Sequence, residues 1–264
     1  MPSSLYLAAG CALDASADEM ATAAALAGYD GLSLRLSGEH SIEPRRATEF
    51  SRLLDELGVF VHDVEVHRIG PQGADPATLV DMAARLGARY VLVVSDVRNE
   101  ARTIDELGRF SEQCRAAGLT AALEYMAWTM PNASADALRI AEATDAAVVS
   151  DLLHHHRLGE GAVEIGALAA TGRLAWVQLC DAPAIAPTGG NAALIEEARH
   201  RRLPPGHGEL PLLDLLRAVP AETPMSIEVQ SDELRHITVE TRATMLHRAA
   251  VDTLARAHDP SSTG

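Results

Sequence analysis

The chain has 264 residues, of which 47% are hydrophobic and 3% aromatic, so it can bury one large α/β core or two smaller ones built mainly from Ala, Leu and Val. The formal net charge of −15 argues against a nucleic-acid partner, because phosphate binding needs a basic surface. No apolar run approaches a membrane span and the N-terminus lacks the features of a signal peptide, which argues against a membrane partner.

Short apolar runs alternate with longer helical patterns along the whole chain. The eight strand candidates are residues 4–9, 31–36, 59–66, 89–95, 119–124, 146–151, 174–180 and 224–229. The eight helical patterns are residues 18–27, 44–57, 76–86, 104–117, 133–143, 165–170, 210–218 and 239–255. Eight βα units without an intervening linker favour a single (β/α)8 TIM barrel rather than a doubly wound sheet. We expect the barrel to span residues 1–258 and residues 259–264 to form a disordered tail.

Four strand candidates in the second half of the chain end in an oxygen-bearing side chain: Glu124, Asp151, Gln178 and Glu228. Barrel enzymes keep their chemistry at the carboxyl ends of the strands, so we expect these side chains to converge. All-oxygen ligation suits one divalent ion, Mn²⁺ or Mg²⁺ first, with Co²⁺, Ni²⁺ or Zn²⁺ as alternatives. Each residue alone is as easily a salt-bridged structural residue, since buried charges need partners. Trp128 is a candidate for the apolar wall beside the ion.

Three histidines, His154, His155 and His156, follow Asp151 directly. Consecutive residues cannot all face one ion, and an extended strand end would place His154 and His156 opposite His155. His154 is the candidate for a proton-transferring or substrate-orienting imidazole, because an unperturbed histidine titrates near neutral pH. An exposed loop histidine is the alternative.

On the third strand, alternation predicts that Asp63 and Glu65 share one face with His67. If Val64 and Val66 pack against helices, Glu65 points at the barrel mouth and contacts the substrate. Asp63, which lies lower in the barrel, is as easily structural as functional.

The longest loop, residues 181–208, follows the seventh strand and is the predicted lid or substrate clamp. Near its end, Arg201, Arg202 and His207 surround a Pro-Pro-Gly turn. Clustered arginines in an acidic protein suggest recognition of an anionic or polyhydroxylated substrate. A surface ion pair is the alternative for Arg201.

The order of these motifs resembles the xylose-isomerase-like TIM-barrel superfamily of sugar phosphate isomerases and epimerases, over nearly the whole chain. The segment SDLLHHHR resembles the family's D-x-x-H-x-x-R segment and maps its Asp, His and Arg to Asp151, His154 and Arg157. RLPPGHGELPL, which begins at Arg202, resembles its R-x-x-PG-x-GE loop, with His207 where acidic residues are common.

The seventh strand departs from the sugar epimerases, because many of them carry a ligand His where this chain has Gln178. The segment VQLCDAP looks more like the branch that includes bacterial 3-dehydroshikimate dehydratases. The resemblance implies a divalent metal ion and a metal-stabilised enediolate of a small keto-sugar or keto-polyol, with Glu124 and Glu228 as the acid/base carboxylates. Return of the proton gives isomerisation or epimerisation. Loss of a β-hydroxyl makes a metal-dependent lyase of the 3-dehydroshikimate dehydratase type the alternative.

The expected partner is therefore a small polyhydroxylated or keto-acid substrate, and assembly into a homo-oligomer is left open. The side chains assigned to substrate binding are Glu65, Trp128, Arg157, Arg202 and His207. A barrel used only for binding is a third hypothesis, under which the four strand-end side chains would be coincidental. Three scattered cysteines in no metal-ligand spacing fit a reducing compartment, so we expect a cytoplasmic protein.

Overall fold

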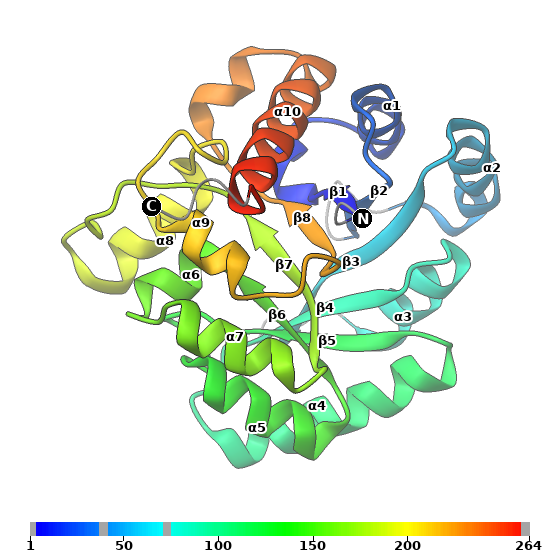
Figure 1. Cartoon of the computed structure of the whole chain (residues 1–264). Coiled ribbons are helices and arrows are strands. Elements are labelled where there is room, and N and C mark those ends of the chain that lie inside the picture. The colour runs from blue at the N-terminus through cyan, green and yellow to red at the C-terminus, as the bar shows by residue number, and fades with distance from the viewer. Residues whose placement is uncertain (1–3, 37–41, 71–74, 260–264) are drawn as a thin grey trace.

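The computed structural model of the chain describes residues 4–36, 42–70 and 75–259. Its sheet is a closed barrel in which each parallel strand pairs with the next and the last pairs with the first (Figure 1). The strands are β1 (Leu5–Leu7), β2 (Gly31–Arg35), β3 (Phe60–Ile69), β4 (Tyr90–Ser95), β5 (Thr120–Glu124), β6 (Ala147–Asp151), β7 (Leu174–Leu179) and β8 (Met225–Ile227). The predicted single TIM barrel is confirmed. Residues 260–264 of the predicted tail lie outside the described residues.

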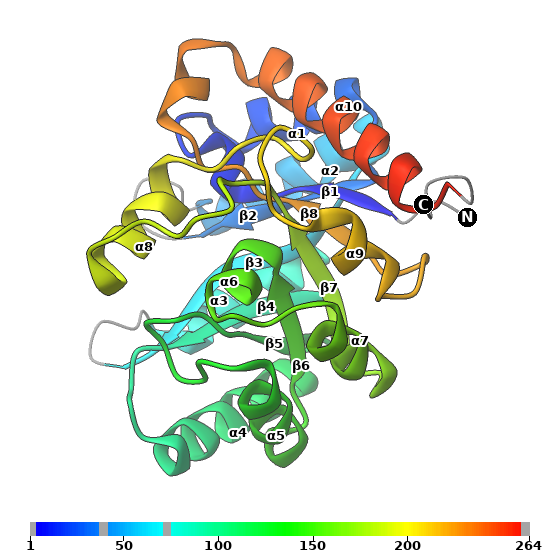
Figure 2. The same ribbon diagram turned by 60° about the vertical axis from the view of Figure 1, so that its left-hand side comes forward.

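The helices lie outside the strands and surround the barrel (Figures 1 and 2). The α-helices are α1 (Ala17–Ala27), α2 (Ala47–Leu57), α3 (Pro76–Arg85), α4 (Glu100–Ala116), α5 (Ser134–Thr144), α6 (Leu152–Arg157), α7 (Ala162–Ala170), α8 (Gly190–His200), α9 (Leu212–Arg217) and α10 (Val239–Ala257). Short 3-10 helices are η1 (Ala9–Ala12), η3 (Pro44–Arg46) and η4 (Asp232–His236). Within the described ranges, no helix combines the length and apolarity that a membrane span needs.

Two helices, α6 and α8, were not predicted. α6 follows β6 without a loop, because Asp151 caps it by accepting hydrogen bonds from the backbone N–H groups of Leu153 and His154. α8 occupies the middle of the predicted lid, where the run AALIEEAR has high helix propensity. The long loop after β7 is therefore partly ordered as a helix.

The barrel interior explains where the polar strand ends point. An apolar cluster of Leu92, Val94, Ala122, Val149 and Trp176 fills the inside of the barrel. Side chains two residues apart on a strand face the same side, and the site candidates on three strands follow members of this cluster by two residues. The pairs are Ala122 with Glu124, Val149 with Asp151, and Trp176 with Gln178. These polar side chains therefore form a layer on top of the packed core.

The third strand contradicts one prediction, that Glu65 and His67 share a face. The pairing of β3 with β4 shifts register between Val64 and His67, as at a β-bulge, which reverses the alternation beyond it. Glu65 lines the cavity described below, whereas the ring of His67 stacks on Phe110 of α4 with centroids 3.9 Å apart. His67 therefore belongs to the packing between the sheet and the helices.

Candidate active site

A cavity of about 520 Å³ opens at the carboxyl ends of the strands. Seven of the predicted site residues line it: Glu65, Glu124, Trp128, His154, Gln178, Arg202 and Glu228. Asp151 is fully buried and lies against this set. The four side chains at the strand ends, which we expected to converge, thus lie in or against one cavity.

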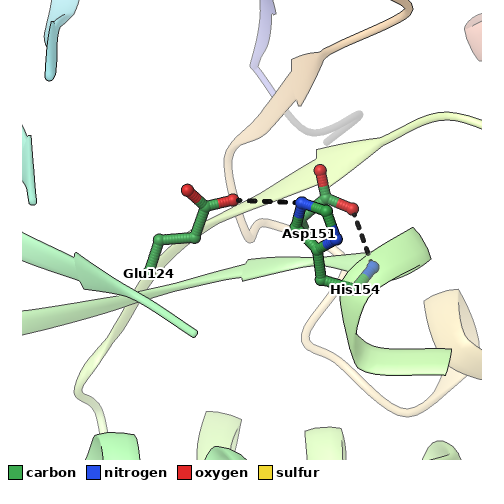
Figure 3. A group of neighbouring side chains, drawn as sticks. All are labelled: Glu124, Asp151 and His154. Carbon is green, nitrogen blue, oxygen red and sulfur yellow. Dashed lines mark hydrogen bonds and ion pairs between the residues drawn. The ribbon is translucent and has the colours of Figure 1, made fainter. Parts of the chain in front are cut away.

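Glu124, Asp151 and His154 form a tight cluster of potential metal ligands. One ligand atom from each residue lies within 4.8 Å of the others, and all three residues are buried. Figure 3 shows the carboxylate of Glu124 pointing toward the imidazole of His154, whose Nε2 lies 3.9 Å from Glu124 Oε1. The backbone N–H of His154 donates to Asp151 Oδ1 at 3.1 Å. The ends of β5 and β6 and the first turn of α6 thus supply the three donors.

A fully buried arginine balances part of this negative charge. Arg202 Nη1 donates to Asp151 Oδ2 at 2.5 Å and to the backbone carbonyl of Glu228 at 3.1 Å. Its Nε donates to the carbonyl of Ala198 at 2.7 Å. Burial alone would raise the pKa of Asp151, but Arg202, His154 and the backbone N–H of His154 together outweigh burial, and the pKa of that carboxyl lies below its ordinary value. Asp151 is therefore ionised.

For the other two strand-end carboxylates, burial and neighbouring carboxylates outweigh the effect of Arg202. Burial raises the pKa of Glu124 well above its ordinary value, and the nearby charges of Glu228 and Asp151 raise it further. Burial and Asp151 also raise the pKa of Glu228, although Arg202 acts in the opposite direction. The floor of the cavity thus concentrates negative charge, which a cation would stabilise.

Glu228 and Gln178 add oxygen donors to the cavity. Glu228 Oε1 accepts a hydrogen bond from Gln230 Nε2 at 2.9 Å. Gly10 allows this pair, because a Cβ at Gly10 would meet Gln230 Nε2 at 2.7 Å and Glu228 Oε1 at 2.9 Å. Within the described part of the chain, the buried Oε1 of Gln178 has no hydrogen-bond partner.

The donor set fits a divalent cation. It combines carboxylates, an imidazole and the unpartnered amide oxygen of Gln178. Burial, together with Arg202, lowers the pKa of His154 to about 4, so its ring is neutral at pH 7. A neutral imidazole can bind a metal ion or orient a substrate, and it suits these roles better than donating a proton.

The three consecutive histidines lie on a helix, so the expected extended arrangement is wrong. His155 is fully buried, and its Nδ1 lies 2.8 Å from the hydroxyl of Tyr125. The same hydroxyl lies 2.7 Å from Ser150 Oγ. This network links residues next to Glu124, Asp151 and His154, and so holds β5, β6 and α6 together.

Two predicted substrate contacts do not line the cavity. Arg157 donates to both carboxylate oxygens of Glu197 at 2.7 and 2.8 Å and to the carbonyl of Pro183 at 2.7 Å. It therefore fastens the start of the long loop to α8. His207 is exposed and lines a separate surface groove with Leu26 and residues of α10.

Several cavity residues were missed at the sequence level. Arg35 ends β2, lines the cavity and donates to Glu65 Oε2 at 2.8 Å. The rule that strand ends form the site would have identified it. Arg68, near the carboxyl end of β3, follows the same rule. The others come from loops and helix ends and carry no such signal: Arg199, His200, Gln230 and Arg235.

The Glu65 carboxyl predicts a pH dependence of stability. Burial raises its pKa from 4.5 to about 7, against the opposing effect of Arg35. The stability that Glu65 contributes is thus fully present below about pH 4.5 and is lost as the pH rises through about 7. Between pH 5 and 8, chelator-treated wild type should lose stability relative to Glu65→Gln in urea unfolding. The control Glu49→Gln, at an exposed position on α2, should show the same pH dependence of stability as wild type. A pH-independent difference for Glu65→Gln would contradict the assignment.

Solved structures share this barrel at low sequence identity. The IOLI protein, in a structure with a bound zinc atom, has a TM-score of 0.83 at 15% identity and covers 98% of this chain and 100% of its own. The probable 3-DHS dehydratase AsbF from Bacillus anthracis has a TM-score of 0.72 at 13% identity, with 93% and 98% covered. D-allulose 3-epimerase from Methylomonas sp., in complex with D-allulose, has a TM-score of 0.69 at 15% identity, with 97% and 98% covered.

A xylose isomerase-like TIM barrel/4-hydroxyphenylpyruvate dioxygenase fusion protein has a TM-score of 0.80 at 22% identity. The match covers 99% of this chain but only 45% of the fusion protein, so this chain spans less than half of that protein. No curated protein matches the sequence. The family model described as xylose isomerase-like TIM barrel matches residues 21–255. This chain therefore belongs to the xylose isomerase-like TIM barrel family.

Proposed function

We propose that the protein is a divalent-metal-dependent isomerase or epimerase of a small keto-sugar or keto-polyol. The observation that carries this proposal is the pair Glu124 and Glu228, two buried carboxyls with raised pKa that line one cavity. Proton transfer at the carbon next to a carbonyl needs a base to remove the proton and an acid to return it. Two carboxyls that line the same cavity and have raised pKa suit both roles.

In this proposal, Glu124, Asp151 and His154 hold the metal ion, with Gln178 and Glu228 as the further ligands. The ion supplies Lewis-acid polarisation of the substrate carbonyl when it is bound. The solved structure of the IOLI protein with a zinc atom supports a metal site in a barrel of this fold. The charge of the ion would also offset the crowding of the three carboxylates.

The protein's own side chains perform the proton transfers. One of Glu124 and Glu228 takes the proton from the substrate carbon, and the other returns a proton to the other face or to the neighbouring carbon. The hydrogen bond from Gln230 orients the carboxyl of Glu228. Trp128 and Met126 form an apolar part of the cavity wall and limit the access of water.

A dehydratase of the 3-dehydroshikimate type is the second candidate. Gln178, at the end of β7, stands where a histidine is found in many sugar epimerases, and this departure favours the lyase branch. The shared fold of the probable 3-DHS dehydratase is compatible with it. Both reactions begin with removal of a proton next to a carbonyl, and they differ in whether a β-hydroxyl then leaves.

Solvent exchange in D₂O tests the proposal and separates the two reactions. The Mn²⁺-loaded protein is incubated with a panel of keto-sugars and, separately, with 3-dehydroshikimate. We expect deuterium next to the carbonyl of a keto-sugar without loss of water, and we expect chelator treatment to abolish this exchange. A new conjugated absorbance from 3-dehydroshikimate would instead establish the dehydratase. If the metal-loaded protein catalyses neither reaction, the proposed proton-transfer function is wrong.

A further inference from the structure

The cavity at the barrel mouth is rich in cations, although the protein as a whole is acidic. Five of the chain's 22 basic Lys and Arg residues line it, all of them arginines, together with three glutamates. They are Arg35, Arg68, Arg199, Arg202 and Arg235. A protein of net charge −15 repels small anions over most of its surface, so a local excess of guanidinium groups makes this cavity the place where an anion is attracted.

Three of these arginines balance charges of the protein itself. Arg35 and Arg202 pair with the buried carboxylates of the site described above. Arg68 Nη1 donates to both carboxylate oxygens of Asp96 at 3.0 and 3.1 Å. These three side chains therefore have protein partners and do not require a ligand.

Arg199 and Arg235 differ from the other three. Among residues 4–36, 42–70 and 75–259, no carboxylate forms an ion pair with Arg199. Arg235 forms one ion pair, from Nε to Asp232 at 3.4 Å, and both partners are about half exposed. Exposed pairs of this kind are weak, so an incoming anion can compete for the guanidinium of Arg235.

The two arginines lie on segments that contact each other. Arg199 is in the last turn of α8, and Arg235 is in η4, after β8. The backbones of Arg201 and Ser231 form an antiparallel bridge between these segments. His200 Nδ1 also lies 3.2 Å from a carboxylate oxygen of Asp232. The end of α8 and the start of η4 therefore meet at the same side of the cavity mouth.

We propose that Arg199 and Arg235 form a subsite for an anionic group of the substrate, a carboxylate or a phosphate. This inference rests on the proposed function, because it concerns the molecule whose carbonyl reacts beside Glu124. A guanidinium offers a planar set of donors that matches the oxygens of either anion. A neutral sugar would use the acidic floor of the cavity and leave these two arginines without a role.

A structural role for Arg199 makes a different prediction. A cation in the last turn of a helix stabilises that helix through its dipole. Such an effect changes stability and leaves the choice of ligand unaltered. Ligands that share a polyol chain and differ in whether they carry an anionic group separate the two roles.

Three non-reacting polyols serve as probes: ribitol, ribonate and ribitol 5-phosphate. They have no aldehyde or ketone carbonyl, so their dissociation constants, measured by calorimetry on the Mn²⁺-loaded full chain, do not depend on turnover. We expect ribonate or ribitol 5-phosphate to bind about tenfold more tightly than ribitol, as charge-assisted hydrogen bonds allow. Arg199→Gln and Arg235→Gln should remove this difference and leave the affinity for ribitol unchanged. Arg85→Gln removes the same charge from the outer surface of α3, where Arg85 pairs with Asp81, and should preserve the difference.

Each outcome decides one question. A gain for the carboxylate alone or for the phosphate alone identifies the anion. Equal affinities, failure of both anions to bind, or a gain that persists in both arginine variants would overturn the subsite. The D₂O exchange experiment is independent of these measurements. A loss of the proposed function with an intact arginine-dependent gain would therefore be distinguishable from the reverse.

Discussion

Glu124→Gln is expected to lower the rate of solvent exchange into the best keto-sugar of the panel by about 10³-fold or more, because it removes one of the two proton-transferring carboxylates and a metal ligand. The fold should remain intact. In the metal-free protein, the buried Glu124 carboxylate is raised in energy by burial and by the charges of Glu228 and Asp151. A neutral amide of the same shape avoids that cost, so the chelator-treated variant should be at least as stable as wild type at pH 8.

The comparison needs both readouts. Exchange is followed by NMR in D₂O and stability by urea unfolding, with the exposed Glu49→Gln as a control that should behave as wild type in both. A Glu124→Gln protein that is folded and retains more than about a tenth of the exchange rate would show that Glu124 is not essential, since acid/base groups contribute about 10²-fold or more.

Arg202→Met is expected to destabilise the protein by about 3–5 kcal/mol, the usual cost of leaving one partner of a buried ion pair uncompensated. Both side chains of the Asp151–Arg202 pair are fully buried. In the variant, Asp151 has no remaining arginine or lysine partner among the described residues. The double variant Asp151→Asn/Arg202→Met removes both charges and should recover a large part of the loss, as measured by urea unfolding.

The neighbouring Arg201 provides a matched control. It is exposed and pairs with Glu196 at 3.4 Å, so Arg201→Met should change stability by no more than about 0.5 kcal/mol. If Arg202→Met costs no more than Arg201→Met, or if the double variant is no more stable than Arg202→Met, the Asp151–Arg202 pair does not have the assigned role.

The repeated local pattern of the sequence was sufficient to predict the barrel. The spacing of apolar residues that marks a strand or a helix is a local property of the sequence. Eight strands that alternate with eight helices leave few other folds that bury every apolar segment. The same logic brought Glu124, Asp151, Gln178 and Glu228 to one rim, because parallel strands present their carboxyl ends at the same edge. The position of Glu65 also followed from its strand, although that of His67 did not, because a register shift is not visible in the residue pattern.

Contacts between loops that are distant in the sequence required the tertiary structure. Asp151 and Arg202 are 51 residues apart, and nothing in either local segment indicates their pairing. For the same reason, the sequence could not separate Arg157, which binds Glu197, from Arg199, which lines the cavity. Local sequence periodicity thus determined the architecture and the acidic floor of the site. The long-range packing of the loops alone decided which arginines neutralise that floor and which two line the cavity without a buried partner.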